Sequence, residues 1–130
     1  MTQSAQSTEV PPALRKWFVV HFAADMLFGI PLLFFPEWLM GLLGWEVIDP
    51  FTARLVGAAL MAIGLESLLG RNASIQSFVT MLRLKIVWSA AALLGIGLTM
   101  FEGAPPTGWL IFVIFAAFHL VWIYWFVRLR

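Results

Sequence analysis

Six titratable side chains lie inside long apolar stretches of this 130-residue chain, where charge is costly and therefore informative. They supply two carboxylates, two imidazoles and two cationic groups. Such groups can pair to hold helices together, relay protons, or hold the polar head of a ligand. They are His21, Asp25, Glu66, Arg83, Lys85 and His119.

The spacing of these residues places them in one layer. At 1.5 Å per helical residue, His21 and Glu66 lie roughly 8 Å from the nearest flanking charge. Asp25 and His119 lie roughly 14 Å from theirs. His21 and Asp25 are four residues apart, so they share one face of a helix. We therefore expect a polar layer in one half of a helical bundle, with Lys85 in the same half.

One reading of this layer is structural. Glu66 would pair with Arg83 or Lys85 across a helical hairpin, because pairing makes buried charge tolerable in lipid. Asp25 would accept a hydrogen bond from His21 or Lys85. Arg83 would otherwise extend its side chain toward the membrane surface. In this reading the polar layer only holds the helices together.

Functional readings stay open beside it. The layer could form a pocket for a lipid, a quinone or an isoprenoid, with Phe28, Trp88 and Trp122 as its walls. Asp25 could couple the movement of a solute to that of a proton, since carboxylates at this depth often relay protons. Either reading makes the chain a small-molecule binder or carrier.

A b-type haem between His21 and His119 is a further possibility, because imidazole is a haem ligand and bundle cores host cofactors. Their depths differ by about one helical turn, and no recurring histidine pattern surrounds either.

The chain has no cysteine, which excludes disulfides and thiolate chemistry. No nucleophile elbow, phosphate loop or zinc-protease motif is present, and Ser89 is expected to bond a backbone carbonyl. We expect no cofactor, no metal and no enzymatic activity.

Four apolar runs position these residues, each long enough to cross about 30 Å of hydrocarbon. With 62% hydrophobic and 12% charged residues, the composition is that of a membrane protein. The expected fold is all-α: a membrane four-helix bundle with up-down-up-down connections, in one domain at 14–130 after a disordered tail at 1–13. The spans are expected at about 17–35, 51–69, 83–101 and 109–127.

A short segment separates the first two spans. Pro36 can open a new helix, and the stretch that follows is too short to cross the membrane. Its two tryptophans and flanking acids predict a helix that lies in the interface. Asp49 is expected to cap the second span.

Basic residues predict the orientation. Seven of the eight lie in three groups, at 15–16, 71–85 and 128–130. Since Lys and Arg near spans stay on the cytoplasmic side, we expect a multi-pass protein of the inner membrane with both termini in the cytoplasm. The net charge of +1 gives no reason to expect nucleic acid as a partner.

A series of short segments carries a family resemblance. They are Phe35-Pro36-Glu37-Trp38-Leu39, Leu43-Gly44, Asp49-Pro50, Arg54-Leu55-Val56-Gly57-Ala58-Ala59-Leu60 and Ala62-Ile63-Gly64. With these segments, residues 17–70 resemble the small four-helix bacterial and archaeal membrane proteins of unknown function that are related to the DoxX group. The resemblance implies a four-helix inner-membrane protein and carries over no catalytic residue. In that pattern Arg54 would anchor the outer end of the second span, bonded to Asp49 or Glu46, or would extend to the interface alone.

Small residues recur along the second and third spans. Ala53, Gly57 and Gly64 are four and seven residues apart, and the stretch 89–97 is rich in alanine and glycine. Such spacing lets another helix approach closely. We therefore expect an accessory or assembly subunit without catalysis, which packs in the bilayer as a homo-oligomer or against a larger membrane complex. The binder or carrier is the alternative.

Overall fold

The computed structural model describes residues 9–130 as five helices, with no strand among those residues. Four of the helices are long: α1 (Pro12–Phe34), α3 (Pro50–Leu69), α4 (Ile75–Phe101) and α5 (Thr107–Arg128). Each of these four is long and apolar enough to cross a membrane, as in a multi-pass membrane protein. The short helix expected after the first span is confirmed as α2 (Pro36–Leu42).

The helices begin where local capping chemistry allows, earlier than hydropathy predicts. α1 begins at Pro12, since proline is well suited to a first helical turn. α4 begins at Ile75, because the hydroxyl of Ser74 accepts a hydrogen bond from the backbone N–H of Ser77. The expected tail at 1–13 therefore includes helical residues, and Val10 is already buried in the core. Residues 1–8 lie outside the described part of the chain.

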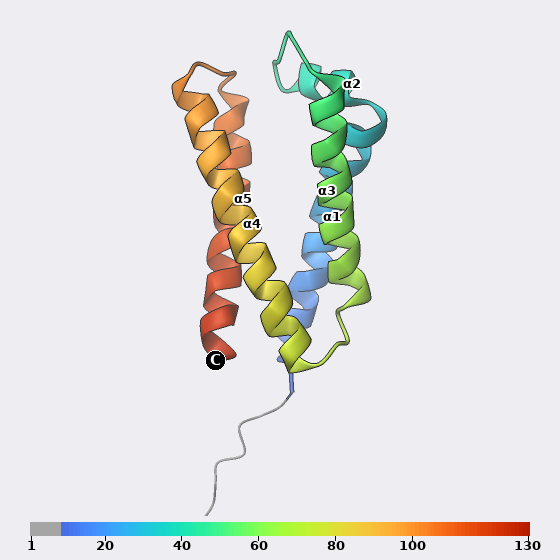
Figure 1. Ribbon diagram of the computed structural model, residues 1–130, viewed down its shortest axis with the longest axis vertical. Helices are drawn as coiled ribbons and strands as arrows, with labels where there is room; N and C mark the ends of the chain where they lie inside the picture. The colour runs from blue at the N-terminus through green and yellow to red at the C-terminus, as the bar shows by residue number, and fades with distance from the viewer. Residues whose placement is uncertain (1–8) are drawn as a thin grey trace, which may run out of the picture.

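The long helices form two pairs (Figure 1). α3 lies against α1, and α5 lies against α4. The pairs meet at the end of the molecule where α3 connects to α4, which we call the core end. They diverge toward the opposite end, which carries α2 and which we call the α2 end.

An aromatic core joins the two pairs at the core end. The ring of Phe18 in α1 stacks on that of Phe78 in α4, with centroids 4.4 Å apart. Phe18 also meets Trp122 of α5 edge-on, with centroids 5.8 Å apart. Leu14 and Leu82 are fully buried beside these rings. Aromatic pairs of this geometry stabilise beyond their buried area, so this end holds the pairs together.

Glycines allow the close approach of α1 and α3. A Cβ on Gly57 would lie 2.8 Å from the backbone nitrogen of Leu33 and 2.9 Å from the carbonyl oxygen of Gly29. A Cβ on Gly64 would lie 2.6 Å from the Cβ of Asp25. The small-residue face of the second span is therefore used within this chain, against α1.

Arg54 anchors α3 through a different partner from the one expected. Its Nε donates a hydrogen bond to the carbonyl oxygen of Leu33, at 3.1 Å, rather than binding Asp49 or Glu46. The carbonyls in the last turn of α1 lack a helical donor, and the guanidinium supplies one. The side chain thus ties the beginning of α3 to the end of α1.

Asp49 caps α3 as expected. Its carboxylate accepts hydrogen bonds from the hydroxyl of Thr52 and from the backbone N–H of Phe51, the latter at 3.1 Å. These two bonds, that of Thr52 first, hold the pKa of Asp49 below its ordinary value. The carboxylate therefore stabilises the folded chain only while it is ionised.

We expect Asp49→Ala to lower the thermal midpoint at neutral pH, because α3 loses its cap. A carboxylate with a lowered folded pKa stabilises above its unfolded value, roughly 3.9, and this contribution is lost as the pH falls through the folded value. The gap in thermal midpoint between the parent and Asp49→Ala should therefore shrink below about pH 4. Glu46→Ala, in the same loop, is the control. A gap that stays constant with pH would contradict the capping role.

Candidate functional site

An apolar cleft of about 740 Å³ lies between the α1–α3 pair and the α4–α5 pair. Its volume falls within the range of small-molecule sites. Phe28, Trp88 and Trp122, the three side chains expected as pocket walls, all line it. The other apolar walls include Leu32, Leu39, Val56, Leu60, Ala92, Gly95, Ile111 and Phe115.

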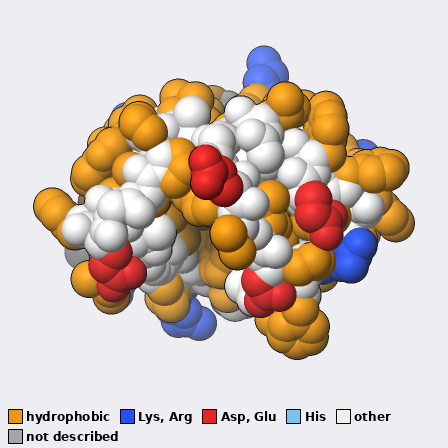
Figure 2. All heavy atoms as spheres, turned by 90° about the horizontal axis from the view of Figure 1, so that it is seen from above, with side chains coloured by type: hydrophobic (Ala, Val, Ile, Leu, Met, Phe, Trp, Pro, Cys, Tyr) orange, Lys and Arg blue, Asp and Glu red, His pale blue; other side chains and the backbone are white. Residues whose placement is uncertain are grey.

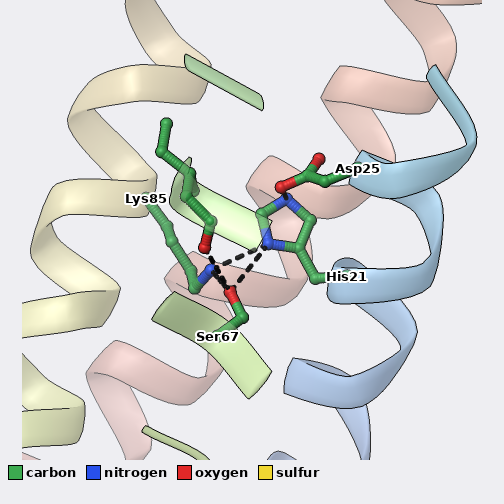
Figure 3. Close-up of polar contacts among 5 residues, drawn as sticks. His21, Asp25, Ser67 and Lys85 are labelled. Atoms are coloured by element: carbon green, nitrogen blue, oxygen red, sulfur yellow. Dashed lines mark hydrogen bonds and ion pairs between the residues drawn. The ribbon is translucent and has the colours of Figure 1, made fainter. Parts of the chain in front are cut away.

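Buried polar side chains from three helices meet one another (Figure 3), and two of them border this cleft. α1 contributes His21 and Asp25, α3 contributes Ser67, and α4 contributes Lys85. We call these four residues the polar cluster. His21 and Asp25 line the cleft, and each is only 6% exposed.

Lys85 joins the three helices of the polar cluster. Its Nζ lies 2.8 Å from Nδ1 of His21 and donates to the hydroxyl of Ser67. The rest of its surroundings are aromatic, with Nζ 4.8 Å from the ring centroid of Phe18 and 5.0 Å from that of Trp122. Because a lysine ammonium can only donate, Nδ1 of His21 accepts from it, which leaves the ring hydrogen on Nε2.

Asp25 and Ser67 complete the hydrogen-bond inventory. Ser67 donates to the carbonyl oxygen of Ile63 at 2.9 Å, so its oxygen is free to accept from Lys85. Nε2 of His21 lies 3.4 Å from Oδ2 of Asp25. Oδ2 is buried, and no described residue hydrogen-bonds to it, so the contact is electrostatic only. Asp25, which lines the cleft, therefore keeps a buried acceptor without a donor.

A second polar contact lies beside the cluster. Oγ of Ser89 is 2.6 Å from Nδ1 of His119 and donates to the carbonyl oxygen of Ile86, as expected for this serine. Ser89 lines the cleft with His21, whereas His119 does not. A haem held by both histidines stays a prediction. Among residues 9–130, no group of three or more potential ligands could hold a metal ion.

Glu66 and Arg83 lie outside the polar cluster, with both side chains exposed. Neither Arg83 nor Lys85 lies within ion-pair distance of Glu66. The expected ion pair of Glu66 with Arg83 or Lys85 is therefore not formed, although Lys85 and Glu66 attract each other at longer range. Successive helical residues point about 100° apart, so Ser67 rather than Glu66 faces the other helices.

The residue type of Ser67 does not by itself indicate a site, but its spacing from other residues does. Intervals of three, four and three separate Gly57, Leu60, Gly64 and Ser67. Such intervals fall on one helix face, and all four residues are buried. Ser89 likewise follows Lys85 by four residues, which places both on one face of α4.

No family model, curated protein or solved structure matches this chain. The resemblance of residues 17–70 to DoxX-related proteins therefore stays a prediction. The function is inferred from the cleft and the polar cluster.

Proposed function

We propose that this membrane protein binds a lipophilic small molecule in the cleft between its two helix pairs. The observation that carries the proposal is the junction of an apolar cleft of about 740 Å³ with the buried polar cluster. Apolar walls with a few convergent polar groups are typical of small-molecule sites. A cluster that only held helices together would use its buried acceptors, whereas Oδ2 of Asp25 has no hydrogen-bond partner among residues 9–130.

The orientation in the membrane is part of the proposal. We place the four long helices up-down-up-down in the inner membrane, with both termini in the cytoplasm. Basic residues at 15–16 and 128–130 support this placement. Acidic side chains gather on the face at the α2 end (Figure 2). α2, with Trp38 exposed, would lie in the outer interface, and a lipid-soluble molecule would enter from the outer half of the bilayer.

Binding is favoured over an accessory or assembly role. That role was inferred from small residues available to another helix, and Gly57 and Gly64 already pack against α1. The open space at Gly95 in α4 belongs to the cleft. Ala92 and Gly95 therefore support a site at least as well as an interface between chains.

Filling the cleft tests the proposal. Ala92 lines the cleft, whereas its neighbour Ala91 is exposed elsewhere on α4. We expect Ala92→Phe to weaken the binding of a nitroxide-labelled octadecyl alcohol at least about tenfold, because the ring occupies the space that the chain needs. Ala91→Phe should leave binding unchanged. Saturable quenching of tryptophan fluorescence in nanodiscs measures binding, with Trp88 and Trp122 as reporters in the cleft.

A second variant shows whether weaker binding comes from filling the cleft or from a structural change at Ala92 alone. No atom lies within 4 Å of a Cβ built on Gly95, so Gly95→Phe fills the cleft from another position without a clash at its Cβ. It should weaken binding as Ala92→Phe does. Equal binding by Ala92→Phe and Ala91→Phe, or no saturable quenching in the parent protein, would contradict the proposal.

A further inference from the structure

We propose that the ligand has an uncharged hydrogen-bond donor as its polar head, a hydroxyl group on a long apolar body, and that this hydroxyl donates to Asp25. The inference rests on the proposed function and deepens it by naming the ligand class. It follows from which donors and acceptors of the polar cluster are already in use.

The donors of the polar cluster are engaged within the chain or lie away from the cleft. Lys85 donates to His21 and Ser67, the rest of its ammonium group faces aromatic rings, and it does not line the cleft. Ser67 donates to the carbonyl oxygen of Ile63. The remaining ring hydrogen of His21 lies on the nitrogen that faces Asp25. A carboxylate, phosphate or ketone head group needs free donors, and this cluster offers none.

Asp25 is the member of the polar cluster that can still accept a hydrogen bond. Its side chain is only 6% exposed and lines the cleft, and its Oδ2 accepts no hydrogen bond from residues 9–130. A carboxyl group can accept hydrogen bonds on both of its oxygens. A buried acceptor left without a donor destabilises the protein, so a ligand that brings a donor is favoured at this point.

Charge balance favours a neutral donor over a cationic one. Lys85 is the one buried cation of the cluster, and it attracts both the buried carboxylate of Asp25 and the exposed carboxylate of Glu66. An ammonium head group would place a second positive charge near Lys85 in an apolar surrounding, where the two cations repel each other. A hydroxyl donates its hydrogen and leaves the balance unchanged.

Four octadecyl probes with the same nitroxide in the chain test the inference, because they differ only in the head group. The heads are a hydroxyl, its methyl ether, a carboxylate and a primary ammonium, and binding to the unmodified protein is measured in nanodiscs. We expect the hydroxyl probe to bind at least about tenfold more tightly than the ether, which keeps the oxygen but lacks the donor. It should also bind more tightly than either charged probe. An ether that binds as tightly as the hydroxyl, or a charged probe that binds more tightly, overturns the inference.

Asp25→Asn tests the acceptor itself. The amide keeps the shape of the side chain and replaces one acceptor oxygen by a donor, so the preference for hydroxyl over ether should fall toward one. An unchanged preference in the folded variant overturns the assignment to Asp25. The head-group comparison in the unmodified protein remains decisive if the variant does not fold.

The two proposals fail in different ways. If no probe shows saturable quenching, or if Ala92→Phe leaves all of them unaffected, binding in the cleft is wrong. If quenching is saturable and sensitive to Ala92→Phe but indifferent to the head group, the cleft binds and the hydroxyl inference alone is wrong.

Discussion

Lys85→Met is expected to destabilise the protein by about 1–3 kcal/mol, because the buried acceptors on His21 and Ser67 then lose their charged donor. Lys85 is 3% exposed, and methionine can fill part of its volume without its charge. The substitution leaves Asp25 buried without a cation and removes the donor to His21 and Ser67. The measurement is the free energy of unfolding in mixed micelles.

Arg83→Met is the matched control, because it removes a cation from the same helix at an exposed position. It should change the free energy of unfolding by no more than about 0.5 kcal/mol. Adding Asp25→Asn to Lys85→Met should recover part of the loss, since no uncompensated charge then remains. Equal costs at Lys85 and Arg83, or no recovery in the double variant, would show that Lys85 does not stabilise through Asp25.

Gly57→Ala should destabilise the protein by about 1–3 kcal/mol, the usual cost of overpacking. Its new Cβ would lie 2.8 Å from the backbone nitrogen of Leu33 and 2.9 Å from the carbonyl oxygen of Gly29. Backbone atoms cannot turn aside as a flexible side chain can, so α1 and α3 must separate. The same unfolding measurement in mixed micelles applies.

The control for Gly57→Ala is a substitution that should not lower the free energy of unfolding. Gly95→Ala places its Cβ in open space, and alanine is favoured over glycine inside a helix by about 0.8–1 kcal/mol. We therefore expect Gly95→Ala to be neutral or stabilising. A Gly57→Ala protein as stable as Gly95→Ala would mean that α1 and α3 are less closely packed than the distances at Gly57 indicate.

The four long helices were predictable because length and apolar composition are local properties. Their starts were less so. The third span was expected to begin near residue 83, whereas α4 begins at Ile75. The Ser74 cap starts the helix there, and its first turns include polar residues such as Gln76 that lie before the most apolar part. A hydropathy pattern reports how much of a helix suits lipid, and capping determines where the helix begins.

The depth of the polar residues along their helices was predictable from the sequence, but the direction in which each side chain faces around its helix was not. Counting from flanking charges placed His21, Asp25 and Lys85 in one layer, and these three residues do meet. The same count placed Glu66 there, although it is exposed and its neighbour Ser67 faces inward. Depth follows from position along one helix, whereas rotation depends on which helices pack together.

The cleft itself could not be read from the chain. It exists because Phe18, Phe78 and Trp122 join the helix pairs near one end, while the pairs diverge toward the other. These rings are far apart in the sequence, and aromatic residues are also spread over the exposed surface. Composition does not distinguish a ring that closes a core from one that faces lipid.

The cleft is tested most directly by the saturable tryptophan quenching that the octadecyl alcohol probe causes in nanodiscs, compared between Ala92→Phe and Ala91→Phe. If the cleft binds a lipophilic molecule beside the polar cluster, Ala92→Phe weakens binding at least about tenfold and Ala91→Phe matches the parent. Equal affinities in the two variants, both folded, would contradict binding in the cleft.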